Sequence, residues 1–215
     1  MSPPRNGKRR RALLLACAVV IAAVVGLVAA LSGGHSKTTT TGDVRSAAGD
    51  PVLVSGTPAA FRYLSGQHSN RCGLTPAELE ASPPVGHLQG SCCFPMDLST
   101  YEWQVQALHR DAAIRQIPSD PYDVPVSLAR RLLRYDHAIH LSARQQATYD
   151  RAMSMSREKG PCCCHCWRWS AFRGMSKYLI VHAHYTASQL ALVIDDVEGC
   201  GGKDTPPSLH IQSAT

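Results

Sequence analysis

The sequence predicts an all-α fold: a small domain of several short helices that carries a Cys-rich loop and lies behind an N-terminal transmembrane helix. Two observations support this fold class. Helix-capping residues recur between residues 61 and 202, each followed by apolar residues at helical spacing. Aromatic residues make up only 6% of the chain, which favours an aliphatic helical core, and no strand–helix–strand pattern of a parallel sheet is evident.

Residues 12–31 form an apolar stretch without a charged side chain, ALLLACAVVIAAVVGLVAAL. As a helix, this stretch is long enough to span the roughly 30 Å hydrocarbon core of a membrane. The basic segment 1–11 before it is expected to stay in the cytoplasm, which places the rest of the chain outside. Two alternatives remain open: a signal peptide cleaved near Val28-Ala29-Ala30, and a lipid-modified Cys17 after Leu14-Leu15-Ala16.

The remainder of the chain divides by composition into three parts. Residues 32–60 are dominated by Gly, Ser, Thr and Pro, which predicts a flexible linker. Residues 61–202 form the predicted helical, Cys-rich domain, and residues 203–215 a disordered tail. The sequence therefore predicts a single-pass protein of the cell membrane with an extracytoplasmic C-terminal domain.

Capping residues mark the helices of the predicted domain. Thr75-Pro76-Ala77-Glu78 combines an N-cap threonine, a proline at the first helical position and a glutamate at the third. Ser142 is followed by Gln145 in the same way, and Gly160 is the expected end of that helix. Further helices are predicted at residues 99–116, 127–140, 172–184 and 187–197. Residues 86–95 are predicted to form a loop, and residues 118–125 a turn-rich break.

The main functional feature is the cysteine run at residues 162–166. It consists of Cys162, Cys163, Cys164, His165 and Cys166. A protein core needs shape and apolar area, which Leu or Val supply without a reactive sulfur, so this run indicates metal, disulfide or thiol chemistry. In extended backbone alternate side chains face the same way, so the first, third and fifth residues present three sulfurs of a tetrahedral site.

The fourth ligand is expected from outside the cysteine run. Cys200, His182 and His184 are the candidates, while Cys163 and His165 are spare ligands on the other side of the run. Thiolates with imidazole suit zinc, and thiolates alone suit Cu(I). The sequence therefore predicts a domain that binds copper or zinc and stores, delivers or senses the ion at the outer face of the membrane.

Two other functions fit the same residues. As the first turn of a helix, Cys163-x-x-Cys166 is a CxxC pair at a positive helix end, which suits thiol–disulfide exchange. Alternatively, the domain is a disulfide-stapled interaction module without chemistry. A disulfide between Cys72 and either Cys92 or Cys93 would close a loop of about twenty residues and contribute about 3 kcal/mol.

Pro161-Cys162-Cys163-Cys164-His165-Cys166 resembles the signature of a family of bacterial membrane-anchored proteins and lipoproteins named for a PCYCGC motif. The resemblance covers about residues 142–202, and only the motif is specific. Three of the cysteines match the family's three, whereas Cys163 stands where tyrosine is usual and His165 where glycine is usual. The resemblance implies an exported domain with a metal-binding role and implies no reaction.

Charge and motifs exclude some classes of partner. Residues 1–11 contribute five of the six net positive charges, which leaves a net charge of about +1 for the rest of the chain. This is not the basic stripe of a nucleic-acid-binding protein. No Ser/His/Asp arrangement or phosphate loop is evident, so the sequence does not indicate an enzyme. The predicted partners are the membrane and a metal ion.

Overall fold

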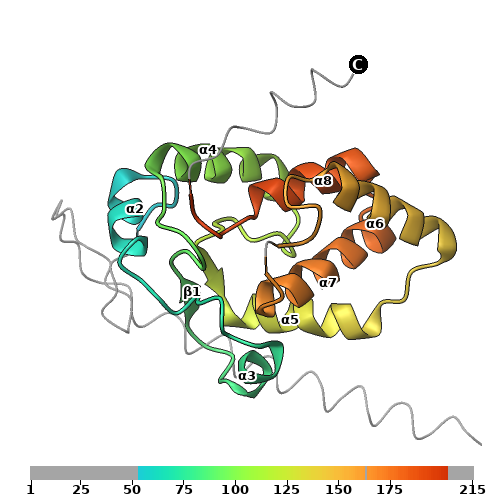
Figure 1. Ribbon diagram of the computed structural model, residues 1–215, viewed down its shortest axis with the longest axis horizontal. Helices are drawn as coiled ribbons and strands as arrows, with labels where there is room; N and C mark the ends of the chain where they lie inside the picture. Colours follow the sequence, from blue (N-terminus) through green and yellow to red (C-terminus); the bar gives the residue numbers. More distant parts are fainter. Residues whose placement is uncertain (1–52, 163, 203–215) are drawn as a thin grey trace, which may run out of the picture. The chain divides into compact units, whose positions relative to one another are not determined.

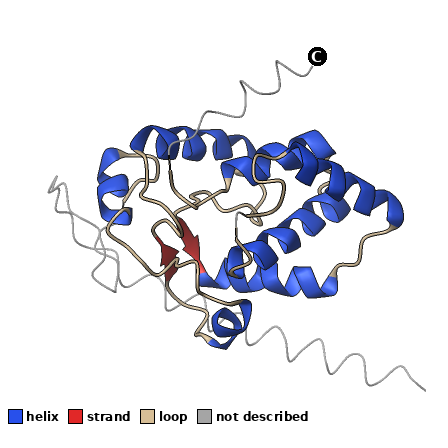
Figure 2. Cartoon of the chain, viewed as in Figure 1, coloured by secondary structure: helices blue, strands red, loops and turns tan. Residues whose placement is uncertain are grey.

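The computed structural model describes residues 53–162 and 164–202, which contain seven α-helices, one short 3-10 helix and one two-stranded sheet (Figures 1 and 2). Strands β1 (His87–Gln89) and β2 (Asp123–Pro125) pair antiparallel, with Leu88 opposite Val124. The helices are α2 (Pro58–Leu64), α3 (Pro76–Ala81), α4 (Leu98–Leu108), η2 (His109–Asp111), α5 (Val126–Ala138), α6 (Ala143–Met155), α7 (Trp167–His182) and α8 (Ala187–Asp196).

The predicted fold class was wrong. The domain is not all-α, because β1 and β2 form within the predicted loop and the predicted break. Three-residue strands are too short to show the alternation that identifies a strand. Among the described residues, no helix is long and apolar enough to cross a membrane; α7 has 16 residues and carries Arg168, Arg173 and Lys177. The predicted span at residues 12–31 lies outside the described residues.

The helix caps agree with the sequence at several positions. Thr75, Ser142 and Thr186 cap α3, α6 and α8, each in a capping box with the third helical residue. The N-cap of helix α4, in contrast, lies two residues earlier than expected, because Asp97 and not Ser99 accepts the hydrogen bond from Thr100 N. Helix α2 begins in the predicted linker, where Thr57 is the N-cap and Pro58 the first helical residue, and continues into the predicted domain.

Helix α7 is the central element, and it packs against α5 on one side and against α6 and α8 on others (Figure 1). Trp167, Phe172, Met175 and Leu179 are fully buried along its length. A helix buried on most of its surface lacks a clear polar stripe. The sequence consequently predicted only its second half, from residue 172.

The packing of α7 on α5 depends on Gly174. A Cβ atom at this position would lie 2.0 Å from the carbonyl oxygen of Leu132 and 2.7 Å from the backbone nitrogen of Asp136. Asp136 also joins the two helices. Its carboxylate accepts hydrogen bonds from Arg173 and forms an ion pair with Lys177. Together these contacts hold the middle of α7 against α5.

Candidate functional site

All seven cysteines that the structure describes gather in one place, which we call the cysteine cluster. They come from four separate segments: the turn before α3, the loop after β1, the loop before α7 and the segment after α8. In chain order they are Cys72, Cys92, Cys93, Cys162, Cys164, Cys166 and Cys200, and none of these seven forms a disulfide. Residues up to 128 positions apart thus converge on one site.

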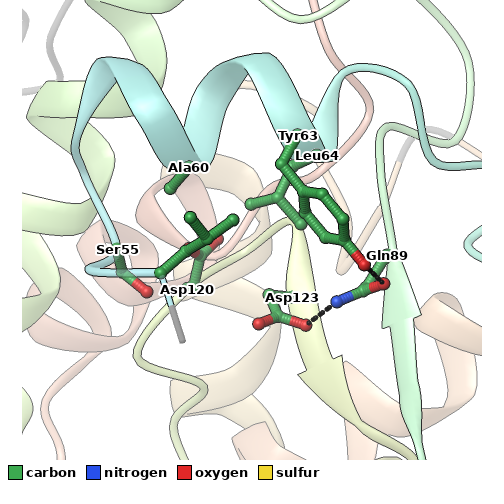
Figure 3. Close-up of a pocket in the computed structure, with 8 residues that line it drawn as sticks. Ser55, Ala60, Tyr63, Leu64, Gln89, Asp120 and Asp123 are labelled. Atoms are coloured by element: carbon green, nitrogen blue, oxygen red, sulfur yellow. Dashed lines mark hydrogen bonds between the residues drawn. The ribbon is translucent and has the colours of Figure 1, made fainter. Parts of the chain in front are cut away.

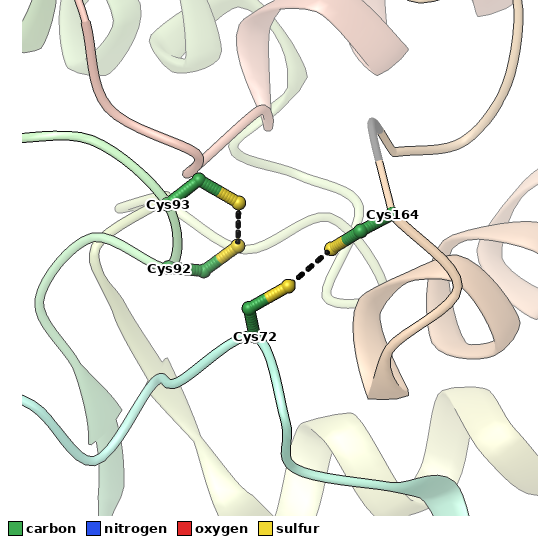
Figure 4. A group of neighbouring side chains, drawn as sticks. All are labelled: Cys72, Cys92, Cys93 and Cys164. Carbon is green, nitrogen blue, oxygen red and sulfur yellow. Dashed lines mark hydrogen bonds between the residues drawn. The ribbon is translucent and has the colours of Figure 1, made fainter.

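The outer group of the cluster contains four cysteines whose sulfur atoms all lie within 4.8 Å of one another. They are Cys72, Cys92, Cys93 and Cys164, and Figure 4 shows their side chains pointing toward a common centre. The Cys72 and Cys164 sulfurs are 3.0 Å apart, and the Cys92 and Cys93 sulfurs 3.1 Å. Cys72 and Cys93 are exposed, so this group lies at the surface.

The inner group is formed by the cysteine run, with the sulfurs of Cys162, Cys164 and Cys166 within 4.8 Å of one another. Cys164 therefore belongs to both groups. The buried Cys200 connects them as well, because its sulfur lies 3.7 Å from that of Cys162 and 3.9 Å from that of Cys92. The result is one continuous set of sulfur atoms that runs from the surface into the core.

Backbone hydrogen bonds hold the four segments together. Cys92 N donates to Gly199 O at 3.0 Å, and Cys93 N donates to Cys200 O at 3.1 Å. Gly201 permits this close approach, because its φ is +83° and a Cβ atom there would lie 2.0 Å from Phe94 O. On the other side of the cluster, Trp167 N donates to Leu74 O at 3.0 Å.

A buried side-chain network lies behind the cluster and contacts the same segments. We call it the Asn70 network. The Asn70 side-chain oxygen accepts from Trp167 Nε1 and Arg168 Nε, both at 3.2 Å, and its amide donates to Gly90 O at 2.7 Å. Arg168 in turn donates to Val197 O and Pro121 O. Each cysteine-bearing segment therefore has an anchor in this network within three residues of a cysteine.

Arg168 is unusual because its guanidinium is fully buried. Its hydrogen bonds go to amide and carbonyl oxygens, and none of the ion pairs found within residues 53–162 and 164–202 includes it. The rings of Trp167 and Phe172 lie 5.1 and 5.2 Å from its guanidinium carbon. Its charge is therefore stabilised by amide and carbonyl dipoles and by two aromatic rings.

The thiols of the cluster differ in acidity because they hydrogen bond to one another. The Cys162 sulfur accepts from the thiols of Cys166, Cys200 and Cys92, and these bonds lower the pKa of Cys162. The bond to Cys162 raises the pKa of Cys92 and that of Cys166. Burial raises the pKa of Cys164, and its hydrogen bond with Cys72 adds to this effect. The arrangement thus places the Cys162 sulfur at the centre of several thiol donors.

The comparisons with known proteins identify no relative that shares this geometry. No family model, curated protein or solved structure matches the chain. The resemblance to the PCYCGC family therefore stays a prediction.

The predicted histidine ligands lie apart from the sulfurs. His165 is exposed, and its ring lies against Trp169 with 4.1 Å between ring centroids. His182 is exposed at the far end of α7, about 24 Å along the helix from Cys166. His184 is exposed beyond it and lines a surface groove with Arg144. Of the predicted ligands outside the run, the structure brings Cys200 to the cluster; Cys163 lies outside the described residues.

Three members of the cluster were not predicted as ligands of this site. For Cys72, Cys92 and Cys93, a disulfide was preferred over a second ligand set or a pairing with the cysteine run, and the structure places them against Cys164. The adjacent pair Cys92-Cys93 was the available signal, because neighbouring cysteines rarely bond to each other and so need other partners.

A second polar site lies beneath α2, but its groups are already paired. Figure 3 shows this small cavity of about 60 Å³, where Tyr63 donates to Gln89 and Gln89 donates to Asp123. Burial raises the pKa of Asp120, although hydrogen bonds from Tyr101 and from Tyr122 N oppose the shift. The cavity therefore serves the packing of α2 on the sheet, and the cysteine cluster is the stronger candidate site.

Proposed function

We propose that the cysteine cluster binds a soft or borderline metal ion, Cu(I) or Zn²⁺, through thiolates. The observation that carries this proposal is the convergence of seven cysteines from four segments, six of which form two ligand groups that consist of cysteine alone. Thiolate ligands select Cu(I) and zinc over hard cations such as Mg²⁺ and Ca²⁺, which require oxygen.

Sulfur–sulfur spacing supports a metal in preference to disulfides. A zinc ion with sulfur ligands at about 2.3 Å holds those sulfurs about 3.8 Å apart in a tetrahedral site. The Cys162–Cys200 separation of 3.7 Å agrees with this value, whereas two sulfur pairs of the outer group are closer, at 3.0 and 3.1 Å. A disulfide requires a separation of about 2.05 Å.

The number of neighbours around each sulfur supports the same conclusion. A cysteine in a disulfide has one bonded partner, whereas the Cys162 sulfur contacts three other thiols. A site with many shared neighbours is what a group of thiolates around a metal ion requires.

Exposure of the outer group favours storage or delivery of the ion over a purely structural role. Structural zinc sites are closed by their ligands, whereas Cys72 and Cys93 face solvent here. Solvent, a chelator or a partner ligand can reach a metal ion bound at this edge. The buried inner sulfurs would retain an ion more strongly, since they are shielded from competing ligands.

Metal analysis of the full chain tests this proposal. The chain is purified with reductant, carrying Cys17→Ser so that only the other eight cysteines can bind, and its zinc and copper are measured before and after titration with each ion. We expect at least one tightly bound ion per chain and a weaker affinity in Cys164→Ser, since serine keeps the size but loses the soft ligand. A reduced, folded chain that binds neither ion would overturn the proposal.

A disulfide-stapled domain is the second candidate, and one distance favours it. The Cys72 and Cys164 sulfurs are 3.0 Å apart, closer than two unbonded sulfurs usually approach, so a small movement would join them. The predicted location outside the cytoplasm, which the described residues do not test, would favour such a bond. Peptide mapping without reductant distinguishes the two: a stoichiometric Cys72–Cys164 cross-link in a metal-free chain supports the disulfide function.

A further inference from the structure

We infer that the cysteine cluster is a two-ion site in which the thiolate of Cys164 bridges an outer and an inner metal ion. This inference rests on the proposed function and adds to it the number of ions, their ligands and the order in which they exchange. It follows from the division of the sulfurs into two groups that share Cys164.

Each group by itself has the composition of one metal site. The outer group offers four sulfurs within 4.8 Å of one another, which is the ligand number of a tetrahedral thiolate site. The inner group offers three sulfurs, and Cys200 lies 3.7 Å from one of them, Cys162. Three or four soft ligands suit Cu(I) or Zn²⁺ at either place.

One ion cannot use the whole cluster. A single four-coordinate ion in the outer group would leave Cys162, Cys166 and Cys200 without a metal in the core, close together and buried. A single ion in the inner group would leave Cys72, Cys92 and Cys93 without one. Sharing Cys164 lets two ions satisfy both groups, and its position in each group is the geometry of a bridging ligand.

Charge is compatible with a second ion. Each thiol that becomes a ligand releases its proton to solvent, so four thiolates around one divalent ion carry a net charge of −2. Six thiolates around two divalent ions that share Cys164 carry the same net charge of −2. A second ion therefore adds no net charge to the partly buried site, where unbalanced charge is costly.

The two ions should differ in exchange, because the two groups differ in exposure. Cys72 and Cys93 face solvent, whereas Cys162 and Cys166 are 3% and 4% exposed. A soluble chelator can therefore attack the outer ion first. The inner ion can leave only after its shared ligand, Cys164, has been freed from the outer one.

Cadmium-113 NMR of the full chain tests the bridge. Cd²⁺ is a soft divalent probe of thiolate sites, and two ¹¹³Cd nuclei show mutual scalar coupling when one sulfur binds both. In the Cys17→Ser background we expect two bound ¹¹³Cd ions per chain, two signals in the thiolate region, and coupling between them. A chelator added in steps should remove one signal before the other.

Three single variants assign the signals to the groups. Cys72→Ser should lose the outer signal and keep the inner one, and Cys166→Ser should do the reverse. Cys164→Ser should abolish the coupling and shift both signals. Circular dichroism of the metal-free, reduced variants shows whether each still folds, and the coupling in the parent chain needs no variant at all.

The outcomes separate this inference from the proposed function. One bound ion, or two signals without coupling in the parent chain, would overturn the two-ion bridge and leave a thiolate metal site in place. Loss of both signals in Cys72→Ser, with the fold intact, would overturn the division into groups. A reduced chain that binds no Cd²⁺ would overturn both the two-ion bridge and the proposed metal site.

Discussion

Replacing Asn70 by alanine tests whether the Asn70 network holds the cysteine-bearing segments in place. The substitution removes three buried hydrogen bonds: those from Trp167 Nε1 and Arg168 Nε to the Asn70 oxygen, and that from the Asn70 amide to Gly90 O. Each buried polar group left without a partner costs about 1–3 kcal/mol. Three such groups cost on the order of 3–6 kcal/mol, since water entering the space left by the amide recovers part of the loss.

The free energy of unfolding of a domain is typically about 5–15 kcal/mol, so a loss of this size is a large share of it. Urea unfolding of the full chain, with reductant and a chelator present, measures it without a contribution from metal. The same titration with Zn²⁺ measures how much the ion adds. We expect Asn70→Ala to lower the free energy of unfolding of the metal-free chain. We also expect it to lower the stabilisation that Zn²⁺ adds, because the unanchored segments must be ordered when the ion binds.

Asn70→Asp is the matched control for this prediction. Aspartate keeps an acceptor for Trp167 and Arg168 and places a carboxylate beside the buried guanidinium, so only the bond to Gly90 O is lost. We expect it to cost about 1–2 kcal/mol. If Asn70→Ala costs less than about 1 kcal/mol, or no more than Asn70→Asp, the network does not anchor these segments.

Three further predictions concern the scaffold around the cluster. Gly174→Ala should destabilise the chain by about 1–3 kcal/mol or more in urea unfolding, because the added methyl group meets backbone of α5, while Gly73→Ala, with nothing within 4 Å, should be nearly neutral. Burial raises the pKa of Asp136, but the hydrogen bonds and charges of Arg173 and Lys177 outweigh it and lower the pKa overall. The resulting stabilisation is therefore complete above the unfolded-state pKa of about 3.9 and is lost as the pH falls through the folded-state value; Asp136→Asn should flatten this part of the stability–pH curve. Tyr101→Phe should cost about 1–3 kcal/mol, because Gly56 N loses its acceptor and the buried Asp120 loses a donor, and unchanged thermal unfolding would contradict this assignment.

Local signals in the sequence were sufficient for some elements of the fold and not for others. The caps at Thr75, Ser142 and Thr186 could be predicted because a capping box needs only two residues that are three positions apart. The start of α7 was not, since no side chain of Cys166 caps it and its first turn is buried by tertiary contacts. Helix α2 carries a Thr-Pro start signal, yet the composition around it is that of a linker, and only its packing on the sheet explains it.

The candidate site shows the same limit more sharply. The cysteine run was recognisable from its composition, but the sequence did not indicate which distant residues lie beside it. His182 and His184 were plausible ligands by proximity in sequence, and α7 carries them to the opposite end of a 16-residue helix. Cys72 and Cys92 joined the cluster because turns around Gly90 and Gly201 bring the loops together, which depends on contacts that no local pattern encodes.

The Asn70 network and the cysteine cluster have different consequences for how metal binding and folding are coupled. The network pairs its polar groups without any metal, so the backbone near Asn70, Gly90 and Arg168 can be ordered before an ion arrives. Under the proposed function, that preorganisation would lower the cost of assembling ligands from four segments and would raise the affinity of the buried inner group for an ion. The outer group gains less, because Cys72 and Cys93 lie on exposed loops that an ion must still order. Retention by the inner group and exchange at the outer group would then both follow from one distribution of hydrogen bonds.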